Sequence, residues 1–80
     1  MTFGQNLRYY RRACGYSQAR LAELLFVDRS SISYYERDKV QPGIRRTLQI
    51  ARALGVKMEA LFDEVPQTAA AGGRKRGRAE

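Results

Sequence analysis

The apolar residues of this chain recur at helical spacing, and short polar or glycine-containing segments separate the helical stretches. In the first stretch, apolar side chains follow one another at steps of four, three and four residues: Phe3, Leu7, Tyr10 and Cys14. Thr2 is suited to cap the start of a helix here, and Gly15 can end it in the left-handed conformation. We therefore expect a first helix whose apolar stripe faces the interior, with Cys14 as a small core residue.

Two short helices joined by a tight turn are expected over residues 17–37. Ser17 and Asp28 are favoured caps for their starts, and Val27 with Ile32 has the spacing of a hydrophobic staple. The first of the two helices has an apolar side for burial: Leu21, Ala22, Leu24 and Leu25. The second has an outward side of small polar, cationic and aromatic residues: Arg29, Ser30, Ser33, Tyr34 and Arg37.

A loop and two further helices follow. Pro42 disfavours helix at the residue before it, and Gly43 breaks the chain after it. The next helix repeats apolar residues toward the core and stops at a glycine: Ile44, Leu48, Ala51, Leu54 and Gly55. The stretch 56–62 predicts a fifth, short helix, and Pro66 marks the end of a domain that covers residues 1–65.

Length and composition allow one helical domain and few chemistries. The chain has 80 residues, one cysteine and no histidine, so neither a Cys/His metal site nor a histidine general base can form. No apolar run approaches the roughly 20 residues that span a bilayer, and the first residues lack the pattern of a signal peptide. We expect an all-α, cytoplasmic protein that is not an enzyme and that binds no metal or cofactor.

The charge of the chain indicates a polyanionic partner. The formal net charge is +7: residues 1–65 contribute +4, from eleven Lys or Arg against seven Asp or Glu, and residues 66–80 contribute +3, from four against one. The second segment has no large apolar side chain to offset the entropy cost of ordering, so a disordered basic tail is expected over 66–80. A basic domain remains without the tail. A membrane surface or an acidic protein would also attract such charge.

Four groups of residues share the order and spacing of a known family. They are Leu7-Arg8-x-x-Arg11 with Gly15-Tyr16-Ser17-Gln18-x-x-Leu21-Ala22; Val27 with Ile32-Ser33; Tyr35-Glu36-Arg37; and Pro42 with Leu48-x-Ile50-Ala51-x-Ala53-Leu54-Gly55-Val56. Over residues 3–62 they resemble the lambda-repressor/Cro-like, or XRE-type, helix-turn-helix family. The resemblance implies a compact five-helix DNA-binding domain whose second and third helices form the helix-turn-helix.

The resemblance and the polar outward side both predict that residues 29–37 form a recognition helix in the major groove of DNA. Short side chains around one arginine let the backbone of this helix approach base edges. The resemblance implies which residues read bases, because these occupy the positions that most often meet bases in the family: Arg29, Ser30 and Tyr34, with Ser33 at the margin. By analogy with the family, six residues are expected to bind phosphates: Gln18, Arg37, Lys39, Gln41, Arg45 and Arg46. Arg11 and Glu36 match positions that form a partly buried ion pair in the family.

Three positions depart from the family pattern. Phe26 stands where glycine is frequent, and a left-handed residue there carries strain on the order of 1–2 kcal/mol. We expect either a different helix end or a buried Phe26 ring to compensate. Asp38 replaces another common glycine, and aspartate tolerates that conformation. Lys57 stands in place of a Ser or Thr cap, so the fifth helix is expected to fray.

The predicted function is sequence-specific binding of double-stranded DNA by a transcription regulator. Because one recognition helix reads only a few base pairs, we expect a homodimer on a near-palindromic operator. The expected dimer surface is Val56, Met58, Leu61 and Phe62, although the same residues could simply close the core of the monomer. No membrane contact or small-molecule ligand is expected.

Two other functions stay open at this point. One is an antitoxin or protein-interaction module whose DNA binding is secondary, and an outward apolar patch would mark it. The other is sequence-blind binding of nucleic acid through the basic tail: Arg74, Lys75, Arg76 and Arg78. The resemblance does not distinguish restriction–modification controllers, phage repressors and antitoxins.

Overall fold

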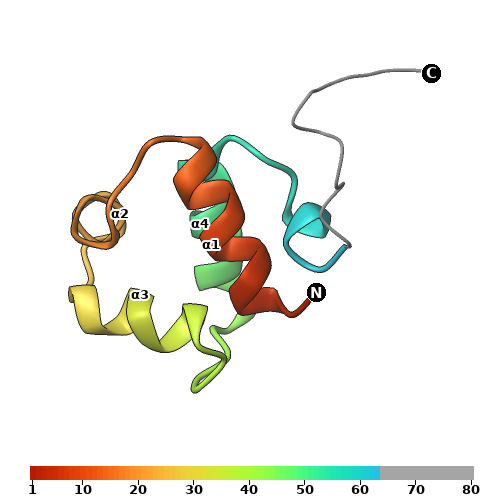
Figure 1. Cartoon of the computed structure of the whole chain (residues 1–80), viewed down its shortest axis with the longest axis horizontal. Coiled ribbons are helices and arrows are strands. Elements are labelled where there is room, and N and C mark those ends of the chain that lie inside the picture. The colour runs from red at the N-terminus through yellow and green to blue at the C-terminus, as the bar shows by residue number, and fades with distance from the viewer. Residues whose placement is uncertain (64–80) are drawn as a thin grey trace.

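The computed structural model describes residues 1–63, and this part of the chain contains four α-helices and one short 3-10 helix. The elements are α1 (Phe3–Ala13), α2 (Gln18–Leu25), α3 (Arg29–Glu36), α4 (Ile44–Leu54) and η1 (Met58–Leu61). Helix α3 packs against α1 and α2, and η1 packs against α1 and α4 (Figure 1). Figure 1 also shows α2 and η1 at opposite ends of the molecule. None of these helices is long and apolar enough to cross a membrane.

The all-helical fold agrees with the prediction, but the prediction of a fifth α-helix over 56–62 is wrong. That stretch forms only η1, which is four residues long. Lys57 occupies its N-cap position and makes no side-chain hydrogen bond to the helix start, so the first N–H groups lack a capping acceptor. The expected tail and the domain boundary at residue 65 lie outside the described residues.

Side chains cap the starts of α1 and α2. Thr2 Oγ1 accepts a hydrogen bond from Gln5 N at 3.1 Å, and Gln5 Oε1 accepts one from Thr2 N at 2.9 Å, which together form a capping box. Ser17 Oγ accepts a hydrogen bond from Arg20 N at 2.9 Å. Asp28 stands at the expected cap position of α3, but its side chain makes no capping hydrogen bond. The first two helix starts are therefore stabilised locally, whereas the start of α3 depends on its packing.

The end of α2 differs from both expectations for Phe26. Its backbone is left-handed, with φ 58° and ψ 43°, and its side chain is 94 % exposed. The helix therefore keeps the left-handed end without a glycine, and burial of the ring does not compensate for the strain. Gly55 ends α4 in the same conformation, with φ 71°, as the sequence predicts.

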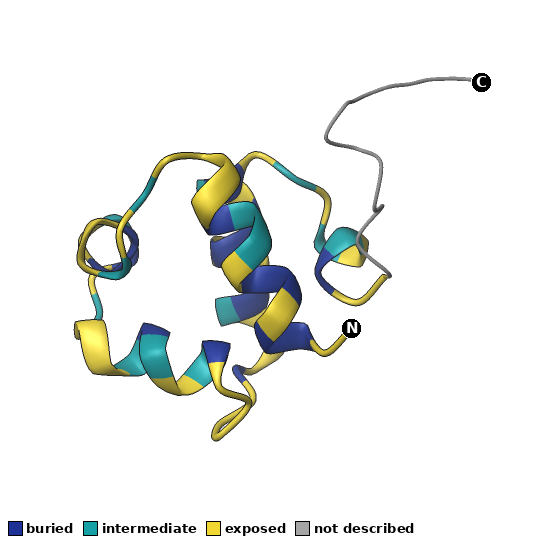
Figure 2. Cartoon of the chain, in the orientation of Figure 1, coloured by how far each residue is buried: buried dark blue, intermediate teal, exposed yellow. Residues whose placement is uncertain are grey.

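The core draws on all five elements, as the dark blue segments in Figure 2 show. Its buried apolar residues are Phe3, Leu7, Leu21, Ala22, Leu25, Ile32, Ile50, Ala51, Leu54 and Leu61. Three expected core residues are exposed instead: Ile44, Leu48 and Cys14. Helix α4 buries the face from Thr47 to Leu54, so Ile44 begins the helix outside the core and Leu48 lies about a third of a turn away. Cys14 follows the last turn of α1, where its Sγ contacts Leu54 O at 3.3 Å.

Gly4 and Asp38 hold the start of α1 against the end of α3. A Cβ atom at Gly4 would lie 2.4 Å from Glu36 O and 2.6 Å from Tyr35 O, so only glycine fits this approach. Asp38 is left-handed, with φ 58°, as the sequence predicts. Its carboxylate accepts hydrogen bonds from Thr2 Oγ1 at 2.6 Å and Gly4 N at 2.9 Å. These contacts fix where α3 lies relative to α1.

Candidate nucleic-acid interface

The four residues expected to read bases share one side of α3. At 100° per residue, Arg29, Ser30, Ser33 and Tyr34 fall within an arc of about 140°. Arg29 and Ser30 are exposed in the first turn of α3, which is yellow in Figure 2. Tyr34 is 45 % exposed and Ser33 is half-buried. We call these four residues the recognition face.

A charged network around Glu36, which lies on the buried edge of this face next to Arg29, holds α3 against α1 and α2. Glu36 is buried, and its carboxylate accepts hydrogen bonds from Arg11 Nε and from Arg11 Nη2, the latter at 3.2 Å. Arg11 Nη1 donates to Tyr16 O at 2.7 Å. Arg8 Nε lies 3.9 Å from Glu36 Oε1. The expected pair of Arg11 and Glu36 is thus present, and it ties α1, α3 and the α1–α2 turn together.

Gln18 connects this network to the recognition face. Its Nε2 donates to Glu36 Oε1 at 3.1 Å, and its Oε1 accepts a hydrogen bond from Arg29 Nη1 at 3.3 Å. The amide expected to bind phosphate is therefore engaged at both ends inside the protein. Through it, the guanidinium of Arg29 is oriented toward the start of α2.

Polar and cationic side chains continue from α3 into the following loop and α4. Arg37 follows α3 and places its guanidinium carbon 5.6 Å from the centroid of the Tyr34 ring, which is a cation–π distance. Lys39, Gln41 and Arg45 are exposed. Four of the six expected phosphate ligands are therefore exposed in the segment that follows α3 in the chain.

Arg46 is separate from this group. It is half-buried, and its Nη1 donates to Leu25 O at 3.2 Å, at the C-terminal end of α2. Carbonyl groups at a helix end carry partial negative charge, so a cation there stabilises α2. The structure thus gives Arg46 an internal contact at the end of α2.

The expected dimer residues do not form one surface. Leu61 is fully buried in the core, and Val56 and Met58 are partly buried against it, whereas Phe62 is 56 % exposed. Phe62 and Met58 instead line a groove of about 270 Å³ with residues of the loop and α4: Gln41, Pro42, Ile44 and Thr47.

Two residues of α4 that were expected in the core expose apolar surface in and next to this groove. Ile44 is 78 % exposed, and Leu48 is one helical turn farther along α4 at 39 %. We call Ile44, Leu48, Met58 and Phe62 the α4–η1 face. The breadth of the apolar surface on α4, which carries too many apolar positions for one buried stripe, could have indicated it.

A family model described as helix-turn-helix matches residues 7–61. The chain belongs to the helix-turn-helix family. This confirms the family expected from the sequence motifs, and α2 and α3 form the motif that gives the family its name.

Two solved structures resemble this helix-turn-helix chain closely. The restriction-modification controller protein C.AhdI from Aeromonas hydrophila is 40 % identical, with a TM-score of 0.72 over 75 % of this chain and 87 % of that one. SinR, a master regulator for biofilm formation, was solved in complex with DNA and is 33 % identical, with a TM-score of 0.73 over 78 % of this chain and 100 % of that one. A SinR of Bacillus subtilis is also among the sequence relatives of this chain.

A curated relative is named as a regulator as well. The SPbeta prophage-derived uncharacterized HTH-type transcriptional regulator YonR of Bacillus subtilis (strain 168) is 33 % identical over 60 residues. The match covers 75 % of this chain and 56 % of that relative, so this chain spans little more than half of its length. These relatives are regulators and not enzymes, in agreement with the prediction from the sequence.

Proposed function

We propose that this helix-turn-helix protein is a transcription regulator that binds double-stranded DNA sequence-specifically, as a homodimer on a near-palindromic operator. The observation that carries the proposal is the recognition face of α3. Its Arg29 donates a hydrogen bond to Gln18, and Gln18 in turn donates one to the buried Glu36. A face that is polar, exposed and rigidly supported suits the major groove, where base edges present distinct hydrogen-bond patterns.

In this proposal, Arg29 makes the principal base contact. An arginine can donate two hydrogen bonds to O6 and N7 of guanine, and a good bidentate pair discriminates by about 1–3 kcal/mol against the wrong base. Ser30 is short enough to let the helix approach and can bond to a neighbouring base. Tyr34 contacts a sugar or a thymine methyl group, and Ser33 lies at the margin of the interface.

Phosphate contacts hold the helix in register without reading sequence. We assign them to exposed residues that follow the recognition face in the chain: Arg37, Lys39, Gln41 and Arg45. Gln18 acts mainly by positioning Arg29, because both ends of its amide are engaged within the protein. Arg46 is left out of the interface because its guanidinium contacts Leu25 O.

The homodimer is proposed to form through the α4–η1 face, in place of the surface expected from the sequence. Ile44 and Phe62 expose large apolar area there, and a second copy would remove that area from water. Two recognition helices about 34–36 Å apart would then meet half-sites separated by one turn of DNA.

Selection of bound sites from random double-stranded DNA tests this function. We expect a consensus with two inverted half-sites whose centres are roughly 10 base pairs apart. A chain truncated after Val65 should select the same consensus, because the truncation leaves α3 and its recognition face intact. DNA binding that yields no consensus and is lost on truncation would instead favour sequence-blind binding through the basic tail. A protein that binds no DNA with or without the tail would favour an interaction module.

A further inference from the structure

Phe26 combines two unfavourable features that nothing within the described residues offsets. Its backbone is left-handed, a conformation that side chains with a Cβ atom rarely adopt, and its ring is 94 % exposed to water. Gly15 and Gly55 occupy the left-handed region after α1 and α4 without such a penalty. An unfavourable residue that packing does not explain points to a function outside the folded monomer.

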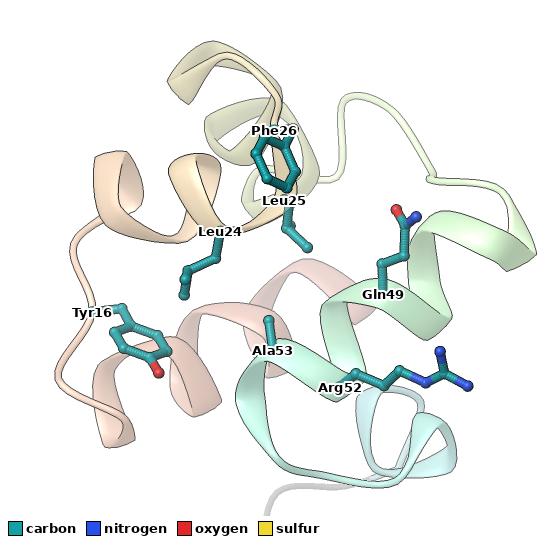
Figure 3. A pocket seen from close by; sticks show the side chains of 7 residues that line it. All are labelled: Tyr16, Leu24, Leu25, Phe26, Gln49, Arg52 and Ala53. Carbon is teal, nitrogen blue, oxygen red and sulfur yellow. The ribbon is translucent and has the colours of Figure 1, made fainter.

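The ring stands at one end of an open groove between α2 and α4 (Figure 3). The groove has a volume of about 440 Å³ and is lined by Tyr16, Leu24, Leu25, Phe26, Gln49, Arg52 and Ala53. We call it the Phe26 groove. In Figure 3, Leu24, Leu25 and Phe26 form one wall and face Gln49, Arg52 and Ala53 of α4. No residue of α3 lines it, so its occupant need not compete with DNA for the recognition face.

The charge at the edge of this groove is positive. Arg52 is exposed and forms no ion pair or side-chain hydrogen bond with any of residues 1–63. Arg20 of α2, in contrast, is paired with Glu23 at 3.0 Å. The groove therefore offers apolar walls beside an unpaired guanidinium, which complements an apolar side chain next to a carboxylate.

We propose that the Phe26 groove binds an acidic amphipathic segment of a second protein. Apolar side chains of that segment would cover Leu24, Phe26 and Ala53, and a carboxylate would pair with Arg52. Bare DNA is a poor occupant because its charged backbone does not complement apolar walls. A second copy of this chain is already assigned to the α4–η1 face by the proposed function, which leaves the Phe26 groove for another protein. This partner site is additional to the proposed DNA-binding function and would let a DNA-bound regulator recruit another protein.

The test is titration of the ¹⁵N-labelled full chain with a synthetic amphipathic peptide, followed by NMR. The peptide is about three helical turns long, with leucines along one face and glutamates on the others, and a matched peptide carries lysine in place of glutamate. We expect the acidic peptide to perturb amides of Leu24, Phe26, Gln49 and Ala53, and the basic peptide to bind at least tenfold more weakly.

Three variants make the result specific. Phe26→Gly removes the ring and relieves the left-handed strain, so it should melt at a higher temperature, bind DNA as the wild type does and bind the acidic peptide at least tenfold more weakly. Arg52→Glu should no longer bind the acidic peptide. Lys57→Glu makes the same charge change outside the groove, and its affinity for the acidic peptide should fall less than threefold.

Four results would overturn the proposal. They are unchanged peptide affinity in Phe26→Gly, equal losses in Arg52→Glu and Lys57→Glu, perturbations confined to other surfaces, and no peptide binding at all. If groove amides shift with protein concentration in the absence of peptide, a second copy is the occupant and the proposed partner is wrong. Failure of DNA binding in the wild-type chain would refute the proposed function without bearing on the groove.

Discussion

Glu36 is the residue on which the recognition face depends most. It lies on the inner side of α3 and receives hydrogen bonds from Arg11 and Gln18, so it joins the packing of α1 to the orientation of Arg29. A buried ion pair adds little net stability, because desolvation of both charges offsets their attraction. Its loss is costly when only one partner is removed, since the other charge is left buried and unpaired.

Substitutions in this pair should therefore be strongly non-additive. Arg11→Met and Glu36→Met should each lower the free energy of unfolding by about 3–5 kcal/mol, while the double variant should lose clearly less than the sum. Urea unfolding followed by circular dichroism measures all three. Single-variant losses below about 1 kcal/mol would show that the pair is not buried as described.

At the scale of elements, we propose that the cations of the loop after α3 and of the start of α4 have two different roles. Lys39 and Arg45 are exposed, whereas Arg46 contacts the end of α2. Neighbouring arginines on one helix therefore have different surroundings, and we expect different roles for them.

This division predicts different salt dependences for the variants. Lys39→Ala and Arg45→Ala should each reduce the slope of log K against log salt concentration by nearly one unit, without changing the preferred sequence. Arg46→Ala should leave that slope unchanged and lower the melting temperature, because α2 loses the cation at its C-terminal end. DNA affinity measured over a range of salt concentrations decides between the roles. A reduced slope for Arg46→Ala would show that Arg46 also binds a phosphate.

Local features of the sequence predicted the elements better than their contacts. The starts of α1 and α2 follow from Thr2 and Ser17, whose caps act within one turn, and Gly55 ends α4 as expected. The approach of Gly4 to α3 could not be predicted, because it depends on how helices distant in sequence pack together. That the four residues of the recognition face share one side of α3 could be predicted, because this follows from helix geometry alone, whereas the contacts of Gln18 with Glu36 and Arg29 are tertiary. Their role in reading bases stays a prediction.

At the scale of the whole molecule, two separate apolar surfaces among residues 1–63 are the proposed interfaces. The α4–η1 face includes Phe62 and Ile44, and the Phe26 groove lies between α2 and α4. A small regulator with a single core can use such faces for assembly and for a partner, while α3 stays free for DNA.

The dimer is tested by a charge placed on the α4–η1 face. Ile44→Glu should make the protein monomeric and weaken binding to a full operator much more than binding to a half-site, because the buried carboxylate would oppose association. Gln49→Glu adds the same charge to another side of α4 and should leave the dimer intact. Sedimentation velocity measures the oligomeric state of both variants, and DNA titration measures their affinities. A wild-type protein that is monomeric and binds a half-site with full affinity would contradict the proposed homodimer.

The central claim is that Arg29, at the start of α3, reads a base. Its most direct test compares wild type and Arg29→Ala on a set of operators in which each base pair of both half-sites is changed in turn. The wild type should lose about 1–3 kcal/mol of DNA-binding free energy when one symmetry-related guanine is replaced. Arg29→Ala should show no preference for that guanine and should keep the wild-type base preferences at all other positions. If Arg29→Ala retains the full base preference of the wild type, the recognition face has been assigned wrongly.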